Sequence, residues 1–168
     1  MKPHPSIYRL KQVYQYDELT GHFYFKINVR SRGKKGAKAG FLLENGYWSI
    51  SLDGISYRAH RLAWFYIYER WPFELDHKDG NRSNNSIKNL RVCTSTQNKG
   101  NSEGWGNKKK SKLPRGVFYL KNENRKKKYW ARIWINYKQV SLGVYFTPNQ
   151  AAQAYHIAAK KHFGEFSK

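Results

Sequence analysis

The sequence is poor in cysteine, in acidic side chains and in long apolar runs. Cys93 is the one cysteine among 168 residues, so no disulfide can form within the chain and a cysteine-rich zinc site is excluded. No segment approaches the ~20 apolar residues of a membrane helix. The first residues, MKPHPSIYRLKQ, also lack the apolar stretch of a signal peptide. We therefore expect a protein of a reducing cytoplasm with no membrane partner.

The shortage of acidic residues leaves a large positive charge. Asp and Glu number 11 against 32 Lys and Arg, which gives a formal net charge of +21. This charge is far more than solubility requires, and it repels itself in the folded state. A polyanionic partner explains it, because each neutralised phosphate releases condensed counterions. Nucleic acid is the leading interpretation. An anionic membrane surface is the alternative, but the sequence has neither a basic amphipathic helix nor a lipid-anchor signal.

The length suits one ordinary domain or two small ones. Hydrophobic residues make up 39% of the chain and aromatic residues 17%, enough for two compact cores. In residues 1–74, the turn-forming pair Asp53-Gly54 joins two alternating runs and predicts a hairpin. Residues 60–71 (HRLAWFYIYERW) predict a largely buried helix that stops before Pro72. The expected strands in this region are HFYFKI (22–27), GYWSISL (46–52) and ISYRAH (55–60).

Residues 99–113 are rich in Gly, Ser, Asn and Lys and show no periodicity. We interpret them as an extended basic linker that lies on phosphates through Lys108, Lys109 and Lys110, with a solvated, disordered tether as the alternative. The rest of the chain, residues 114–168, predicts three strands followed by a helix. The strands are expected at residues 115–121, 128–136 and 139–146.

Three residues mark the start of the C-terminal helix. Thr147 is a candidate N-cap, Pro148 suits the first helical position, and Gln150 stands where a capping box needs it. One face of the helix then carries small and aromatic residues, which let it lie close against a sheet. The residues of this face are Ala151, Ala154, Tyr155, Ala158 and His162.

The stretch LDHKDGNRSNNSIKNLRVCTSTQN (75–98) carries the chemistry. Hydrolysis of a phosphodiester needs an activated water and positive charge near the phosphate and the leaving oxygen. His77 can be the base, since the ordinary pKa of histidine leaves it mostly neutral at physiological pH. Asp76 and a second oxygen ligand can hold a hard divalent ion. Neighbours in a strand point to opposite faces. The two side chains therefore serve one site only if the chain bends there or the phosphate lies between them.

This stretch resembles the HNH nucleases, whose active site is a ββα-metal unit. Their pattern is Asp-His, then Asn-Leu, then a metal-ligating His or Asn on a helix. It is matched here by Asp76-His77, Asn89-Leu90 and Asn98. The resemblance implies that His77 is the general base and that Asp76 and Asn98 hold one metal ion. It also implies that Asn89 supports catalysis by bracing the loop with hydrogen bonds to the backbone.

One departure from the HNH pattern indicates which metal ion to expect. Asn98 stands where the name-giving pattern has His, and an amide oxygen is a harder ligand than imidazole, so Mg²⁺ or Mn²⁺ is expected rather than Zn²⁺. Thr94 or Ser95 would cap the helix that carries Asn98. The sequence is most similar to the homing endonucleases encoded in phage introns, several of which nick one strand. This implies a double-stranded DNA substrate and the cytoplasm of a bacterial host. No symmetric dimer motif is visible, so we expect a monomer.

Three nearby residues have both a reactive and an ordinary interpretation. His60 contacts phosphate or lies near the metal in one interpretation, and makes a structural hydrogen bond at a helix entry in the other. Cys93 is interpreted as a small buried residue rather than a nucleophile. Asp79 precedes Gly80 and is interpreted as a turn residue rather than a second acid.

The second C-terminal strand predicts a face for a partner. Trp130, Arg132 and Trp134 are expected to face away from the helix, where they are costly to leave in water without a partner. A small sheet can enter the major groove, where Arg reads guanine and flat rings pack on sugars and thymine methyls. Packing of these rings on the N-terminal domain is the alternative. The residues expected to face the helix are Tyr129, Ala131, Ile133 and Ile135.

This module resembles the DNA-binding domain of the plant ethylene-response factors, the Apetala type. The resemblance implies DNA contacts from Arg115, Arg132 and Trp134, to which we add Trp130. Ser141 replaces a contacting Trp and Arg132 replaces an acidic residue, so the plant recognition sequence is not carried over. The segments that match are RGV (115–117), YWARIW (129–134), SLGVY (141–145) and AAQAYHIAA (151–159).

These features predict an α+β fold in three parts. A ββα-metal HNH nuclease module with a strand-rich N-terminal extension is expected at 1–98, the basic linker at 99–113, and a three-stranded antiparallel sheet packed on one helix at 114–168. The predicted function is a metal-dependent, site-specific DNA endonuclease. One alternative is a non-catalytic DNA-binding regulator that uses the C-terminal sheet. Another is a basic RNA-binding protein, although a sheet shaped for the major groove of DNA should prefer duplex DNA to A-form RNA.

Overall fold

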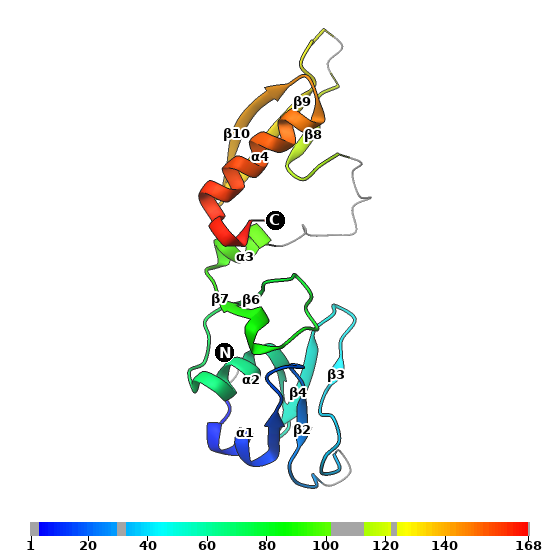
Figure 1. Ribbon diagram of the computed structural model, residues 1–168, viewed down its shortest axis with the longest axis vertical. Coiled ribbons are helices and arrows are strands. Elements are labelled where there is room, and N and C mark those ends of the chain that lie inside the picture. The colour runs from blue at the N-terminus through cyan, green and yellow to red at the C-terminus, as the bar shows by residue number, and fades with distance from the viewer. Residues whose placement is uncertain (1–3, 30–32, 102–112, 122–123, 168) are drawn as a thin grey trace. The chain divides into compact units, whose positions relative to one another are not determined.

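The chain folds into two compact units, Met1–Cys93 and Thr94–Lys168. Both contain helices and antiparallel strands, so the prediction of an α+β fold is confirmed. Most of the predicted linker, including Lys108, Lys109 and Lys110, lies outside the described residues. The computed structural model, drawn in Figure 1, describes residues 4–29, 33–101, 113–121 and 124–167.

The first unit is built from short elements. Its described strands form three antiparallel sheets with the orders β1-β2, β3-β4-β5 and β6-β7. The helices are α1 (Ile7–Val13), α2 (Ala59–Tyr68) and the 3₁₀ turn η2 (Ile87–Asn89). The strands are β1 (Tyr14–Tyr16), β2 (Phe23–Phe25), β3 (Phe41–Leu42), β4 (Trp48–Leu52), β5 (Ile55–Arg58), β6 (Leu75–His77) and β7 (Leu90–Val92).

Side chains from α1, β2 and α2 meet in the core of this unit. Leu10, Phe23 and Leu62 are almost completely buried there. The sequence did not predict α1, which begins where the Ser6 hydroxyl accepts a hydrogen bond from the Arg9 N–H at 3.4 Å. A serine cap of this kind satisfies one of the unpaired amides at a helix start. The N-terminal region therefore contains a packed helix before its first strand.

The predicted hairpin is present, but the predicted helix is shorter than expected. Asp53 and Gly54 join β4 to β5, both with positive φ, at 49° and 83°. The helix α2 ends at Glu69, which is left-handed with φ 52°, and does not continue to Trp71. A left-handed residue ends an α-helix, so this cap, rather than Pro72, sets the boundary.

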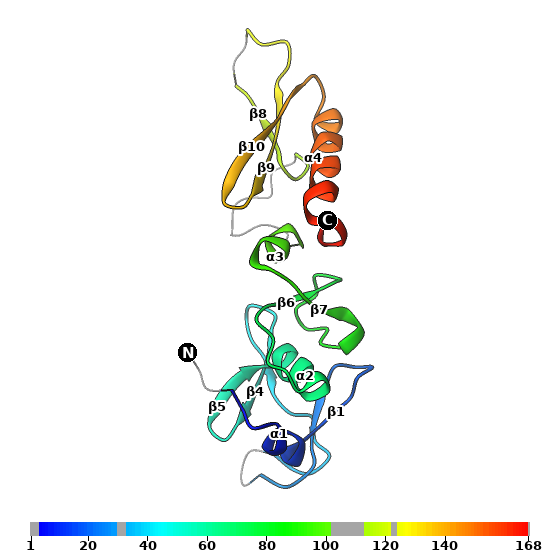
Figure 2. The same cartoon turned by 90° about the vertical axis from the view of Figure 1, so that its left-hand side faces the viewer.

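The second unit contains the predicted sheet on a helix. Its strands are antiparallel in the order β10-β9-β8, and α4 packs on the sheet (Figure 2). This part of the predicted fold is confirmed. The elements are α3 (Ser95–Asn101), β8 (Val117–Tyr119), β9 (Tyr129–Ile135), β10 (Lys138–Tyr145), α4 (Pro148–Phe163) and the 3₁₀ turn η3 (Gly164–Phe166).

The start of α4 follows the prediction, but its buried face differs in part. The Thr147 hydroxyl accepts a hydrogen bond from Gln150 N at 3.2 Å, and Gln150 Oε1 accepts one from Thr147 N at 3.3 Å. His162 is exposed instead of facing the sheet, and Ala158 is only partly buried. The buried residues recur in steps of four, which follow one side of a helix. They are Ala151, Tyr155, Ala159 and Phe163.

In the described part of the chain, no helix combines the length and the apolar character needed to cross a membrane.

Candidate active site

The Asp-His pair lies on the antiparallel hairpin of β6 and β7. Asp76 is opposite Arg91 and His77 is opposite Leu90 in the register of the two strands. All three residues of β6 are buried. Both members of the pair therefore lie inside the protein, although neighbours in a strand point to opposite faces.

Asn89 closes the loop that joins β6 to β7. Its backbone carbonyl accepts a hydrogen bond from Lys78 N at 2.9 Å, and its Oδ1 accepts one from Asp79 N at 3.1 Å. Its Nδ2 donates to the carbonyl of Asn84 at 2.8 Å and to Asp79 Oδ1 at 3.0 Å. These contacts make Asn89 a brace for the loop, which is the structural role that the resemblance implies. A contribution to catalysis stays a prediction.

Asp79 is part of this braced turn. Its Oδ1 accepts a hydrogen bond from Asn81 N at 2.7 Å, and Gly80 between them has a φ of 76°. Burial works to raise the pKa of Asp79, but hydrogen bonds from Asn84, Asn81 and Asn89 outweigh it and lower the pKa. An ionised carboxylate that accepts several hydrogen bonds shapes the turn and cannot serve as an acid.

His77 is held among polar and aromatic groups. Its Nε2 lies 3.1 Å from Asn85 Oδ1, and its ring centroid lies 5.1 Å from that of His60 and 6.0 Å from that of Tyr47. Burial is the largest cause that lowers the pKa of His77. The bond to Asn85 and the nearby carboxylates oppose this shift only in part. The imidazole is therefore neutral at physiological pH, the state that a general base requires.

His60 is a buried packing residue at the start of α2. It is 8% exposed, and its ring centroid lies 5.3 Å from that of Tyr47. Burial, followed by the charges of His77, Arg61 and Arg58, lowers the pKa of His60 to about 3. A side chain so enclosed packs edge to face against the His77 ring rather than contacting a phosphate in solvent. Of the two interpretations of His60, the structural one is favoured.

Asp76 forms an ion pair with Arg91. Arg91 Nη2 and Nε donate to the same Asp76 oxygen, Oδ2, at 2.8 and 2.9 Å, and the two side chains are 11% and 6% exposed. The attraction between two buried charges offsets the cost of removing them from water only when their hydrogen-bond geometry is good. Among the described residues, no group of three or more His, Cys, Asp or Glu side chains could hold a metal. The binding of a cation at Asp76 stays a prediction.

The other predicted ligand, Asn98, lies on α3 in the second unit. Thr94 caps this helix. Its hydroxyl accepts a hydrogen bond from Gln97 N at 3.3 Å, and Gln97 Oε1 accepts one from Thr94 N at 2.8 Å. The predicted cap is thus confirmed, while the sharing of one metal by Asp76 and Asn98 stays a prediction. Cys93 is buried, and burial raises its pKa to about 12, which agrees with a packing role.

The open face of the second unit's sheet carries the predicted aromatic and basic side chains. Trp134 is 61% exposed. The Arg132 guanidinium lies 3.7 Å from the Phe118 ring centroid and 4.9 Å from that of Trp130. Trp130 Nε1 donates to the Ser141 hydroxyl at 2.8 Å. The face therefore presents a guanidinium close to two aromatic rings and one exposed indole.

Arg115, the remaining predicted contact, lies against the helix. Its guanidinium is 5.8 Å from the centroid of the Tyr155 ring on α4. Gly116 beside it has a φ of 73°, and a Cβ there would lie 2.0 Å from that ring. The RGV segment thus uses a glycine to approach α4 closely, and a DNA contact from Arg115 stays a prediction.

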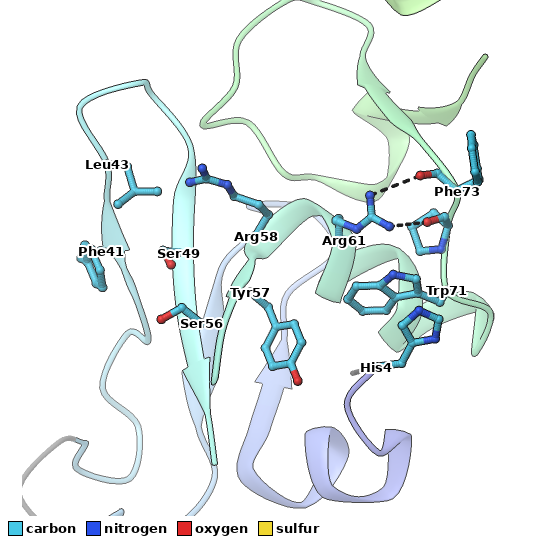
Figure 3. Close-up of a pocket in the computed structure, with 11 residues that line it drawn as sticks. His4, Phe41, Leu43, Ser49, Ser56, Tyr57, Arg58, Arg61, Trp71 and Phe73 are labelled. Atoms are coloured by element: carbon cyan, nitrogen blue, oxygen red, sulfur yellow. Dashed lines mark hydrogen bonds between the residues drawn. The ribbon is translucent and has the colours of Figure 1, made fainter. Parts of the chain in front are cut away.

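A pocket of about 730 Å³ opens elsewhere on the first unit (Figure 3). Its lining comes from the β3–β5 sheet, α2 and the segment after α2. Arg61 donates to the carbonyls of Pro72 and Phe73 at its edge, and His4 stacks on Trp71 with the ring centroids 5.0 Å apart. These contacts involve two of the polar side chains that line the pocket, Arg61 and His4.

Residues 57–99 match the HNH endonuclease family. This segment is similar to HNH endonucleases, and we call it the HNH domain for that reason. It runs from the end of β5 into α3 and includes every residue of the predicted catalytic and metal sets. The chain is also 33% identical over 130 residues to a protein named "Uncharacterized HNH endonuclease L560" from Acanthamoeba polyphaga mimivirus. The alignment covers 76% of this chain and 64% of that protein. No solved structure matches the chain. The Apetala-type resemblance lies outside the HNH domain and stays a prediction.

Sequence reasoning missed two residues of the HNH domain. Arg91 was not predicted to pair with Asp76, although the register of a hairpin closed at Asn89 would place them opposite each other. Asn85 was not predicted to contact His77. Its neighbour Asn84 is the same residue type in the same loop, and no local signal separates the two.

Proposed function

We propose that the protein is a metal-dependent, site-specific DNA endonuclease of the homing type that acts as a monomer and nicks one strand. His77 would be the general base, and Asp76 and Asn98 would hold one Mg²⁺ or Mn²⁺ ion. The observation that carries this proposal is a buried, neutral His77 beside Asp76 on the β6–β7 hairpin of an HNH domain.

His77 would accept a proton from the attacking water. A base near neutrality is most effective when it is unprotonated at the working pH, and burial lowers the pKa of His77 in that direction. The Asn89 brace fixes the loop that follows His77. The ring is therefore held in place before substrate binds, which reduces the entropy cost of reaching the reactive geometry.

The donors at the predicted metal site suit a hard cation. Carboxylate and amide oxygens are ligands that Mg²⁺ and Mn²⁺ accept readily. When bound, such an ion would supply positive charge to the phosphate and the leaving oxygen. The guanidinium of Arg91 neutralises Asp76 in the absence of the ion, so a cation must share the carboxylate with Arg91 or displace it.

The second unit would anchor the protein on duplex DNA. The open sheet face offers Arg132 for a base edge and Trp134 for sugars and thymine methyls. The formal charge of +21 supports phosphate contacts along the backbone. Such contacts set the register of a protein on DNA, so the anchor would determine where the HNH domain cuts.

One observation favours a second candidate, a DNA-binding regulator with an idle nuclease fold. The carboxylate of Asp76 already has a buried guanidinium partner, and such a pair is complete without a metal. Cleavage of a supercoiled plasmid that carries the DNA flanking the gene, measured with Mg²⁺, with Mn²⁺ and with chelator, separates the two candidates.

We expect nicked circles with metal and none with chelator. His77→Ala should lower the cleavage rate by about 10²–10⁴-fold and leave DNA affinity unchanged. His162→Ala, which removes an exposed histidine of α4, is the matched control and should cleave normally. DNA binding without any cleavage by the wild type would support the regulator. Stronger competition by duplex RNA than by duplex DNA would support the RNA-binding alternative.

A further inference from the structure

Asn85 is a polar side chain buried in the loop between β6 and β7. It is 1% exposed. Its Oδ1 lies 3.1 Å from His77 Nε2, and its Nδ2 has no hydrogen-bond partner among the described residues. A buried donor without a partner lowers the stability of the fold. This loss of stability occurs at Asn85, the residue whose oxygen contacts the candidate base.

The backbone of Asn85 is clamped by distant parts of the first unit. The Tyr16 hydroxyl donates to the Asn85 carbonyl at 2.7 Å, and Tyr16 is itself buried. Gly21 lies so close that a Cβ there would stand 2.3 Å from the Asn85 carbonyl carbon. The position of the amide is therefore fixed by tertiary contacts as well as by the loop.

The chemistry of the contact selects one form of His77. A neutral imidazole carries one N–H and one lone pair. A side-chain oxygen accepts hydrogen bonds and cannot donate them, so a bond from His77 to Asn85 Oδ1 requires the proton on Nε2. The basic lone pair is then on Nδ1.

We infer that Asn85 is a positioning residue that holds His77 as the Nε2–H tautomer and so directs Nδ1 to act as the base. The effect on cleavage rests on the proposed function, but the tautomer does not. A reversed amide would donate from Nδ2 to Nε2 and keep the proton on Nδ1. Oxygen and nitrogen of an amide are assigned from such contacts, so the tautomer is the decisive measurement.

The first test uses the unmodified full chain labelled with ¹⁵N-histidine. Long-range ¹H–¹⁵N spectra near neutral pH distinguish the two tautomers of each of the six histidines. His77 is assigned by the signals that disappear in His77→Gln. We expect the Nε2–H form for His77. The Nδ1–H form, or an equal mixture, would overturn the inference without any use of variants.

Two substitutions of Asn85 by residues of similar size then separate the effect of its side-chain oxygen from the effect of its volume. Asn85→Asp keeps the acceptor, so His77 should remain the Nε2–H tautomer and cleavage should stay within about tenfold of the wild type. Asn85→Leu removes the acceptor, so the tautomer should become mixed and the ring should lose its fixed orientation. The rate constant for cleavage should then fall about 10²-fold, the scale of a misplaced catalytic group. DNA affinity should be unchanged in both.

The outcomes distinguish this inference from the proposed function. A wild type that holds the Nε2–H tautomer but cleaves no DNA supports the positioning role and defeats the nuclease proposal. Equal loss of cleavage in Asn85→Asp and Asn85→Leu, with both melting like the wild type and His77 unchanged in tautomer, contradicts the positioning role. If Asn85→Asp unfolds, the measurement on the unmodified chain still decides.

Discussion

Replacing Arg91 by Met should strongly destabilise the first unit. Arg91 donates twice to one oxygen of Asp76, at 2.8 and 2.9 Å, and both side chains are largely buried. Met retains much of the apolar stem of Arg but leaves the Asp76 carboxylate buried without its guanidinium. Removing one partner of a buried ion pair costs about 3–5 kcal/mol. With a slope of about 2 kcal/mol per molar urea, the unfolding midpoint should fall by about 1.5–2.5 M.

Urea unfolding of the full chain, followed by tryptophan fluorescence, measures this loss. Arg9→Met is the matched control, because Arg9 also donates to an aspartate, Asp53, at 3.0 Å, but in an exposed pair. Exposed ion pairs contribute little, so the control should lose far less stability. An equal loss in the two variants would refute the conclusion that burial of Asp76 makes the Arg91 pair important.

A divalent cation should offset part of the loss. In Arg91→Met, Mg²⁺ or Mn²⁺ at about 100 times its Kd would restore about 2.7 kcal/mol, because the cation can neutralise the carboxylate in place of the guanidinium. In the double variant Asp76→Asn with Arg91→Met, the same addition should have no such effect. Equal stabilisation of the single and double variants would show that the cation binds elsewhere.

Three further predictions concern the surroundings of the site. Gly21→Ala should lower the free energy of unfolding by about 2–4 kcal/mol, because overpacking adds to the backbone strain. Gly54→Ala has strained φ but open space and should cost only about 1–2 kcal/mol in the same urea titration. His60→Phe should reduce the loss of stability as pH falls below 6.5, since the pKa of His60 is about 3 in the fold and 6.5 when exposed. Thermal melts of both proteins between pH 7 and pH 4 check this. Cys93 should resist thiol reagents at pH 8 until urea unfolds the chain, because its thiol is buried and its pKa is raised to about 12.

Local signals predicted the elements that local interactions determine. The Asp53-Gly54 turn and the Thr147 cap each depend on residues within a few positions, so the sequence alone located them. The end of α2 at Glu69 was missed, because a non-glycine residue in the left-handed region has no reliable sequence signal. The helix α1 was missed because its seven residues are stabilised mainly by core packing of Leu10 rather than by helix propensity.

The sequence predicted the residues of the candidate site that belong to a motif. It did not predict the residue whose position depends on tertiary contacts. The resemblance of Asp76-His77 and Asn89-Leu90 to the HNH pattern implied that Asn89 braces the loop. The partner of His77 is Asn85, whose backbone is held by a tyrosine 69 positions earlier in the chain. A sequence pattern confined to the loop contains no information on that clamp. The choice between Asn84 and Asn85 therefore required the fold.

The Asp76–Arg91 pair raises the question of why a strongly basic chain buries a carboxylate. Asp76 is the one acidic side chain buried among the described residues. Stability does not account for it, since apolar residues of similar volume in place of a buried ion pair are often as stable or more so. Arg91 neutralises the charge and holds one oxygen in a fixed direction, which is what a positioned metal ligand needs from its neighbours. We therefore propose that the Asp76–Arg91 pair serves the proposed site at the β6–β7 hairpin rather than the folding of the chain.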